Sequence, residues 1–281
     1  MEEKKLINIL RKGTEFLESR GVESPRLNME LLICVALDIN RLQVYTQWDK
    51  PMAEEELIIL RDYTLRRARR EPLQYITGKG SFFDLDLDVN PNVLIPRPET
   101  ELLADIAVRT AKDENLKKIL DIGTGSGCLA IYAALNIPES NVHAIDNSPQ
   151  ALATAKTNAE KNNAQVTFYE MDILKKIPDE KFDFIISNPP YIPENEYKDL
   201  EPELLKEPQG ALLAYKEGLE FYHRMAEIMD RILNPGGCFI FEHGADQKKS
   251  IEMIFSYNRF ELNTFKDIEG NDRIVKGKCR L

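Results

Sequence analysis

The feature that most constrains the fold of this chain is a repeated alternation of short apolar segments and helical segments that begins near residue 99. Apolar segments with the length of strands occur at 118–122, 142–145, 166–169, 182–187 and 238–242. Repeated β-α units predict an α/β fold with a doubly wound, mainly parallel sheet and right-handed crossovers. Two further β-like segments, 260–265 and 273–278, are expected to pair antiparallel at one edge, which makes the sheet seven-stranded.

Residues 1 to about 75 carry the apolar spacing of helices instead. A first amphipathic helix ends before Gly21, and Ser24-Pro25 offers a cap and a first-turn proline to a second. A third helix is expected from about Ala53. We therefore predict a small helical N-terminal domain over 1–75.

A change of period separates this domain from the α/β region. Apolar and acidic residues alternate over 82–89, which predicts a strand with one wet face. Asn90-Pro91-Asn92 supplies a turn, and residues 93–95 are expected to return as the second strand of a β-hairpin. The hairpin lies in a linker, 76–98, that leads into the larger domain over 99–281.

Composition restricts the class of protein. The chain has 281 residues and a net charge of −10, which argues against binding bare nucleic acid. It has no apolar run near the ~20 residues of a membrane span, and its start, Met1-Glu2-Glu3, fits neither a secretory signal nor a transit peptide. Four cysteines without a C-x-x-C pair and three histidines give poor support to a metal site or disulfides. We expect a cytoplasmic protein without a bound metal.

A glycine-rich turn follows the first strand of the α/β region. It consists of Gly123, Thr124, Gly125, Ser126 and Gly127. Such a turn lets a ligand lie against the backbone, and the next helix points its N-terminal amides at it. The third glycine comes one place too early for a dinucleotide fingerprint, and a P-loop lysine is missing. The alternative is a tight turn without a ligand.

Acidic residues follow the next two strands. Asp146 ends the second strand, where a carboxylate can accept hydrogen bonds from both ribose hydroxyls of a nucleoside. Alternatively, Asp146 caps the following helix. Asp172 and Ile173 come after the third strand, where a loop can line an adenine. Together with the glycine turn, this pattern favours a nucleoside cofactor, and the spacing favours S-adenosylmethionine over NAD.

The fourth strand ends in Asn188-Pro189-Pro190-Tyr191. Ligands of open α/β sheets bind beyond the carboxyl ends of strands. Two successive prolines fix the backbone and remove two N–H donors. The Asn188 amide, the Pro189 carbonyl and the Tyr191 ring then form an acceptor-rich cradle for a planar –NH₂ group. A rigid strand exit without chemistry is the alternative.

This motif, with the glycine turn before it, resembles the amino-methyltransferases that act on adenine, cytosine or glutamine. The segment Val-Leu-Ile-Pro-Arg-Pro-Glu-Thr-Glu over 93–101 resembles more narrowly the peptide chain release factor glutamine methyltransferases. Segments 71–78, 207–208, 211–212 and 218–219 also match that family, so the resemblance covers essentially the whole chain. The departures are mild: His243 replaces an aliphatic residue, and Ile173 an aromatic that some members carry.

The resemblance implies a class I, Rossmann-like methyltransferase that uses S-adenosylmethionine. Its substrate would be the glutamine of the Gly-Gly-Gln loop of release factors, with Asn188 Oδ1 and the Pro189 carbonyl accepting the two amide hydrogens. Pro190 and Tyr191 would complete the substrate site, and Asn188 would also touch the cofactor. Arg97 and Glu99 would close the floor of the cofactor pocket or form a structural salt link.

Two rival functions stay open at this point: an adenine-N6 methyltransferase acting on DNA or RNA, and a cofactor-binding module without catalysis. We further expect a monomer that binds neither nucleic acid nor membrane directly. The helical domain is predicted to dock the body of the release factor through Arg66, Arg67, Arg69 and Arg70. The alternative is that these arginines form a solvated helix end that complements the helix dipole.

Overall fold

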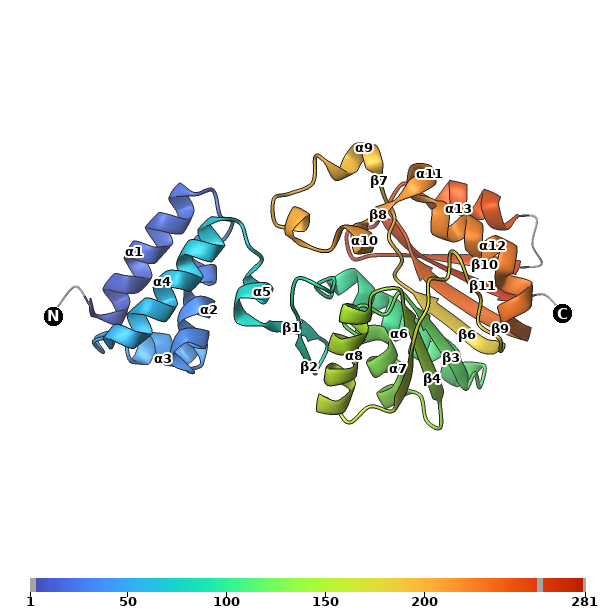
Figure 1. Ribbon diagram of the computed structural model, residues 1–281, viewed down its shortest axis with the longest axis horizontal. Coiled ribbons are helices and arrows are strands. Elements are labelled where there is room, and N and C mark those ends of the chain that lie inside the picture. Colours follow the sequence, from blue (N-terminus) through green and yellow to red (C-terminus); the bar gives the residue numbers. More distant parts are fainter. Residues whose placement is uncertain (1–3, 257–259, 280–281) are drawn as a thin grey trace. The chain divides into compact units, whose positions relative to one another are not determined.

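The computed structural model describes residues 4–256 and 260–279, so Met1-Glu2-Glu3 lies outside the described residues. The chain forms two compact units (Figure 1). The helical unit comprises Met1–Gly78 and the returning segment Glu201–Lys206, and the sheet unit comprises Lys79–Leu200 and Glu207–Leu281. The chain therefore leaves the sheet unit after Leu200 and re-enters it at Glu207.

The helical unit packs its helices around one apolar core. Its elements are α1 (Leu6–Ser19), α2 (Pro25–Leu37), α3 (Arg41–Thr46), α4 (Glu54–Ala68), α5 (Leu73–Thr77) and the short 3₁₀ turn η2 (Leu204–Lys206). Leu10, Leu32 and Leu60 lie in the core, which explains the helical spacing of apolar residues. The three predicted helices are confirmed. Pro25 occupies the first turn of α2, but the Ser24 side chain makes no capping bond.

The sheet unit contains the predicted seven-stranded sheet. Its strands are β3 (Lys118–Ile122), β4 (Asn141–Asp146), β5 (Val166–Glu170), β6 (Phe182–Ser187), β9 (Leu233–Glu242), β10 (Phe260–Lys266) and β11 (Asp272–Cys279). Their order is β10-β11-β9-β6-β3-β4-β5. β9, β6, β3, β4 and β5 run parallel, while β11 pairs antiparallel with both β9 and β10. The doubly wound fold and the antiparallel edge are confirmed.

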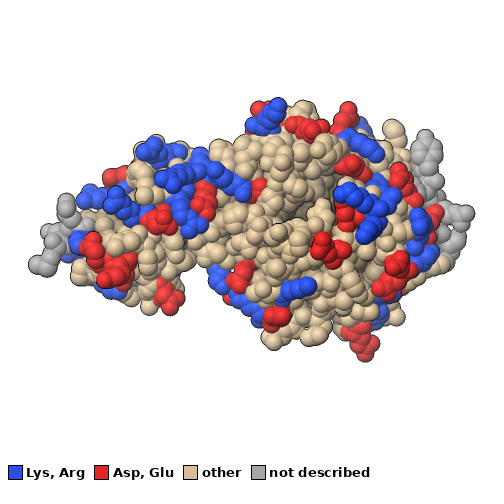
Figure 2. Space-filling view, in the orientation of Figure 1, with Lys and Arg blue, Asp and Glu red and all other residues tan. Residues whose placement is uncertain are grey.

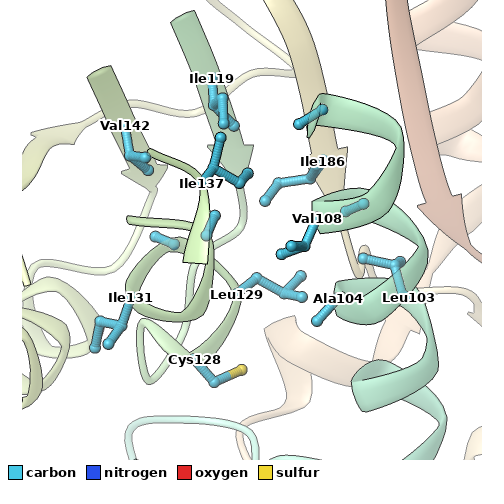
Figure 3. Packing of buried hydrophobic residues seen from close by; sticks show 14 of the residues in the cluster. Leu103, Ala104, Val108, Ile119, Cys128, Leu129, Ile131, Ile137, Val142 and Ile186 are labelled. Carbon is cyan, nitrogen blue, oxygen red and sulfur yellow. The ribbon is translucent and has the colours of Figure 1, made fainter. Parts of the chain in front are cut away.

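Alternation along the strands builds a core on each face of the sheet. Ile119 and Ile186 pack with helices α6 (Pro98–Asp113), α7 (Cys128–Asn136) and α8 (Pro149–Lys161), as the close view of Figure 3 shows for α6 and α7. Leu120 and Ile185 pack on the other face with α12 (Glu220–Ile232) and α13 (Lys248–Phe255). Strands covered on both faces read as continuous apolar runs, which is why they were visible in the sequence.

The predicted hairpin is present with different bounds. β1 (Lys79–Phe82) pairs antiparallel with β2 (Leu85–Asp88), so the stretch predicted as one strand contains the turn of the hairpin. The turn falls at Phe83, whose φ of 50° is left-handed and uncommon for a residue other than glycine. Residues 93–95 form no strand. The prediction of a return strand there was wrong, because Val93 and Ile95 are buried without forming β structure.

Short elements follow the Asn-Pro-Pro-Tyr motif. They are β7 (Ile192–Pro193), α9 (Glu194–Tyr197), α10 (Gln209–Leu212), β8 (Leu213–Ala214) and α11 (Tyr215–Gly218). β7 and β8 pair in parallel, which joins the residues after the motif to a segment about 20 residues further on. Among residues 4–256 and 260–279, no helix combines the length and apolarity of a membrane span.

Candidate active site

A cavity of about 450 Å³ opens in the sheet unit beyond the carboxyl ends of β3, β4, β5 and β6. This volume lies in the ordinary range of small-molecule sites, ~300–1,000 Å³. Eight of the predicted site residues line it: Gly123, Gly125, Asp146, Asp172, Ile173, Asn188, Pro189 and Pro190. Four strand ends far apart in sequence thus converge on one space, as the topology requires.

The glycine-rich turn divides into lining and supporting residues. Gly123 and Gly125 have φ values of 72° and 55°, and a Cβ added at either would meet no atom within 4 Å. The backbone is therefore open on the side that a ligand would approach. Thr124 and Ser126 are buried, and Thr124 Oγ1 donates to Asp121 Oδ2 across 2.6 Å.

Gly127 supports the turn from behind. It caps the N-terminus of α7 with a φ of 86°, and a Cβ there would come within 3.1 Å of Ala155 and Ile131. The cavity lining does not include Thr124, Ser126 or Gly127. These residues therefore maintain the conformation of the turn and do not contact the cavity.

Asp146 braces the glycine turn and faces the cavity. Its Oδ2 accepts from the Gly125 amide and its Oδ1 from the Ser148 amide, both across 2.9 Å. A carboxylate has about four acceptor positions, so two bonds leave capacity for further donors. Burial raises the pKa of Asp146, and the bonds from Gly125 and Ser148 oppose that rise. Helix α8 is capped by the Ser148 hydroxyl, which accepts from the Ala151 amide.

The loop after β5 forms another wall. Asp172 Oδ1 accepts from the Leu174 amide across 3.0 Å, and Lys175 pairs with Oδ2 at 2.6 Å. The Ile173 carbonyl accepts from Arg224 Nε at 3.0 Å, which fixes the backbone where Ile173 meets the space. Ile173 therefore offers an apolar side chain on an anchored loop.

Asn188 is held in one orientation at the end of β6. Its Nδ2 donates to Thr100 Oγ1 across 2.9 Å, and Thr100 Oγ1 donates to Glu242 Oε2 across 2.7 Å. Tyr191 does not line the cavity. Its hydroxyl donates to Glu242 Oε1 at 3.3 Å, and burial followed by the Glu242 charge raises its pKa.

Thr100 and Glu242 were missed as site residues by sequence reasoning. Both are buried, and burial raises the pKa of Glu242 to about 7. Burial likewise raises the pKa of Asp121, near the end of β3, to about 7. For Glu242 the available signal was an acidic residue that ends an apolar strand, as Asp146 does, and Asp121 lies one residue before the end of β3.

Arg97 and Glu99 do not close the floor of the cavity, and Arg97 takes the other expected role, a structural salt link. Neither lines the cavity, and the ion pair of Arg97 is with Glu207. Glu207 is 5% exposed and also accepts from the Ile95 amide at 3.1 Å. The salt link is therefore structural, and it joins two of the sequence segments that carried the family resemblance.

The arginine cluster serves the helical unit itself. Arg66 pairs with Glu71 at 2.5 Å, while Arg67 and Arg70 pair with Glu203 of the returning segment at 2.8 and 2.7 Å. That these arginines dock a partner stays a prediction, but three of them also hold the helical unit together, because their charges pair with carboxylates of the same unit. Arg69 is exposed.

Two further observations concern the binding of nucleic acid and of metal ions. Figure 2 shows Lys and Arg interspersed with Asp and Glu over the drawn face. A groove for nucleic acid would present a continuous basic track. Within the described part of the chain, no group of three or more His, Cys, Asp or Glu side chains is arranged to hold a metal ion.

Known proteins resemble this chain over both of its units. The chain matches the family models "PrmC N-terminal domain" over residues 8–78 and "Methyltransferase small domain" over 99–215. It is 41% identical to the release factor glutamine methyltransferase of Geobacter sulfurreducens, covering 94% of this chain and 93% of that protein. The corresponding protein of Caulobacter vibrioides is 36% identical, covering 93% and 92%.

A solved methyltransferase from Pyrococcus furiosus has the same fold. Its TM-score is 0.56 at 23% identity, covering 78% of this chain and all of that one. A structure of the 16S rRNA N2 G1207 methyltransferase of Thermus thermophilus aligns with a TM-score of 0.52 at 17% identity, covering 72% and 50%. At such identities the likeness establishes the architecture of the sheet unit.

Proposed function

This chain belongs to the family of release factor glutamine methyltransferases, and on that premise we propose that it methylates the side-chain amide nitrogen of the glutamine in the Gly-Gly-Gln motif of peptide chain release factors. The observation that carries the proposal is the orientation of Asn188. Its Nδ2 is directed at Thr100, which leaves Oδ1 as the acceptor that the side chain offers to the cavity. An acceptor beside a rigid Pro189-Pro190 backbone suits a substrate with two N–H hydrogens.

S-adenosylmethionine fits the residues on the other side of the cavity. Gly123 and Gly125 give it open backbone, and Asp146 keeps acceptor positions for the ribose hydroxyls. Asp172 and Ile173 would lie along the adenine, and Thr124, Ser126 and Gly127 would hold the turn in shape. The cofactor supplies an electrophilic methyl group on a sulfonium.

The protein's part in the reaction is positioning. An amide nitrogen is a poor nucleophile because its lone pair is delocalised into the carbonyl. Two acceptors, Asn188 Oδ1 and the Pro189 carbonyl, orient the nitrogen and draw its hydrogens, which enriches it in electron density. Orientation of this kind is worth up to ~7–11 kcal/mol in favourable cases, and preorganised dipoles add to it. Transfer would break the bond between sulfur and the methyl group, leave a neutral thioether and put the positive charge on the amide nitrogen. That cationic amide is acidic enough to lose a proton without a strong base.

The two parts of the chain divide the work in this proposal. Residues 1–75 recognise the body of the release factor, the linker 76–98 leads into the catalytic domain, and 99–281 carries cofactor and chemistry. A Gly-Gly-Gln loop is too small to bind tightly alone, and a second contact raises its effective concentration at the site. In the same proposal the enzyme acts in the cytoplasm as a monomer and modulates translation termination.

Mass spectrometry of a release factor incubated with enzyme and cofactor tests the function. One added methyl group on the peptide that carries Gly-Gly-Gln is the expected result. A parallel incubation with single-stranded and duplex oligonucleotides tests the adenine-N6 alternative. Methylated oligonucleotide with unmodified release factor would overturn the proposal, and cofactor binding without turnover on either would favour a non-catalytic module.

A further inference from the structure

Asn188, Thr100 and Glu242 form a chain of hydrogen bonds behind the cavity. The two bonds measure 2.9 and 2.7 Å, from Asn188 Nδ2 to Thr100 Oγ1 and from Thr100 Oγ1 to Glu242 Oε2. Thr100 is 3% and Glu242 is 1% exposed, so water does not compete for these atoms. Thr100 lies in the first turn of α6 and Glu242 ends β9, both in the sheet unit.

The protons of these groups give the chain one direction. A threonine hydroxyl has one proton to donate, and an ionised carboxylate only accepts. While Glu242 is ionised, Thr100 gives its proton to Glu242 and can only accept from Asn188. The –NH₂ half of the Asn188 carboxamide must then face Thr100, and the oxygen must face the cavity.

We infer that Thr100 and Glu242 are positioning residues that hold the Asn188 oxygen toward the substrate nitrogen. The inference rests on the proposed function, because a substrate with two N–H hydrogens needs an acceptor at this place. If the Asn188 carboxamide were rotated by half a turn about its terminal bond, its –NH₂ group would face the cavity. The N–H donors of Asn188 would then point at the N–H hydrogens of the substrate, and no hydrogen bond could form. The Tyr191 hydroxyl anchors the second oxygen of Glu242, so three side chains fix the orientation of a fourth.

A proton on Glu242 would remove this control. Protonated Glu242 donates to Thr100, and Thr100 is then able to donate to Asn188 Oδ1, which permits the turned-over carboxamide. Burial raises the pKa of Glu242 to about 7, the Thr100 and Tyr191 bonds and Arg273 oppose the rise, and Glu99 adds to it. The correctly oriented fraction therefore increases as pH rises through about 7.

Two further groups face Glu242 and stay neutral near this pH. The Tyr222 hydroxyl donates to the Glu242 backbone carbonyl at 2.7 Å, and burial raises its pKa well above the ordinary range. Burial also raises the pKa of Cys128 to about 12, with Asp121 and Glu242 contributing. Neither group supplies a charge that would reverse the polarity.

The decisive variants act on the threonine. Thr100→Val keeps the shape of the side chain and removes the hydroxyl, and we expect kcat at saturating cofactor to fall about 10- to 100-fold with little change in KM for release factor. Thr100→Ser restores the hydroxyl and should recover most of kcat. Thr110→Val is the matched control, since Thr110 is buried on the same helix and away from the site. Wild-type kcat in Thr100→Val would overturn the inference.

The pH profile separates positioning from mere packing. Wild-type kcat should fall on the acidic side of about pH 7, and Glu242→Gln should flatten that fall. Asp121 is unchanged in both proteins, so the difference between the two profiles isolates Glu242. Superimposable profiles would contradict the polarity argument, whether or not Thr100→Val folds well.

A measurement without substrate keeps this inference distinct from the proposed function. The side-chain amide signal of Asn188 in ¹H–¹⁵N spectra, assigned by its loss in Asn188→Ala, should titrate near pH 7 in wild type and not in Glu242→Gln. An Asn188 signal that ignores Glu242 would refute the positioning role. Failure of wild type to methylate release factor would refute the function alone.

Discussion

The helical unit and the sheet unit each contain a carboxylate that is 1% exposed, Glu30 and Glu242, and they surround it with opposite chemistry. Arg26 and Arg41 donate to Glu30 at 3.1 and 2.7 Å, and Tyr45 donates as well. Burial acts to raise the pKa of Glu30, but these donors together bring it below its ordinary value. Glu242 receives its bonds from hydroxyls, and burial raises its pKa to about 7.

The difference teaches how to tell a structural carboxylate from one poised for a reaction. Breaking a buried charged pair is costly, so cationic partners commit a carboxylate to holding elements together. Glu30 joins α2 to α3 in this way, and Glu203 does the same for Arg67 and Arg70. A buried carboxylate with neutral donors beside a cavity keeps a pKa near the working pH, which is typical of functional sites.

The largest expected difference between the two units comes from replacing one asparagine in each: catalysis should suffer in one case and stability in the other. Asn188→Ala in the sheet unit should lower kcat about 10²- to 10³-fold, the scale of losing one preorganised contact, with little change in cofactor Kd or melting. Asn28 accepts from Arg67 Nε at 2.7 Å in the helical unit, so Asn28→Ala should lower stability and spare kcat. Loss of cofactor binding in Asn188→Ala would instead assign Asn188 mainly to the cofactor.

The arginines of the helical unit give the next largest effect. Arg67→Ala removes one of the two cationic partners of the half-buried Glu203 and the donor to Asn28, and it should cost about 2–3 kcal/mol of unfolding free energy. Arg69→Ala, at an exposed position, should cost less than about 0.5 kcal/mol. Trp48 is the one tryptophan of the sequence and lies in this unit, so its fluorescence during urea unfolding reports the helical unit. Equal losses in the two variants would undo the structural assignment of Arg67.

Replacing Asp146 tests whether the sheet unit binds the cofactor through this carboxylate. Asp146→Ala should weaken S-adenosylmethionine binding by about 1–3 kcal/mol, because a charged acceptor of hydroxyl groups is lost. Asp146→Asn keeps one oxygen and should recover part of that affinity. Calorimetry with unchanged affinity in both variants would remove Asp146 from the cofactor site.

Local patterns explain what the sequence could predict. The strands of the sheet are covered on both faces, so they read as apolar runs, and the glycine turn and Asp146 are fixed by their places at strand ends. Parallel topology brings those ends together, so eight of the predicted residues could be assigned to one space before the structure was known. Helices α1, α2 and α4 follow the same logic through their helical spacing.

What was missed depends on partners that are distant in sequence or on unusual backbone. Thr100 and Glu242 are 142 positions apart, and Arg67 and Glu203 are 136 apart. No spacing rule links such pairs, so Arg67 looked solvated and Thr100 looked ordinary. The hairpin was misplaced because Phe83 adopts a left-handed conformation that glycine or asparagine usually marks.

The last expected effect contrasts the two buried carboxylates, Glu30 and Glu242, by pH. A group whose pKa is raised on folding binds more protons in the folded state, so its contribution to stability is lost as pH rises from its unfolded value through its folded value. Wild type should therefore lose stability relative to Glu242→Gln between pH 5 and 8, by about 1–3 kcal/mol. Glu30 has a lowered pKa, so its contribution is lost only as pH falls through that value.

Glu30→Gln is consequently the matched control for Glu242→Gln. It should destabilise the helical unit by a constant amount between pH 5 and 8, followed by Trp48 fluorescence, and the deficit should shrink only below the ordinary glutamate pKa of 4.5. Far-UV circular dichroism in the same urea titrations follows the helices of both units, so the sheet unit is read from the part of the transition that Trp48 does not report. Because every other titratable group is common to each pair of proteins, the differences report Glu30 and Glu242 alone. Parallel pH dependence in the two pairs would mean that hydroxyl and cationic partners leave a buried carboxylate in the same state.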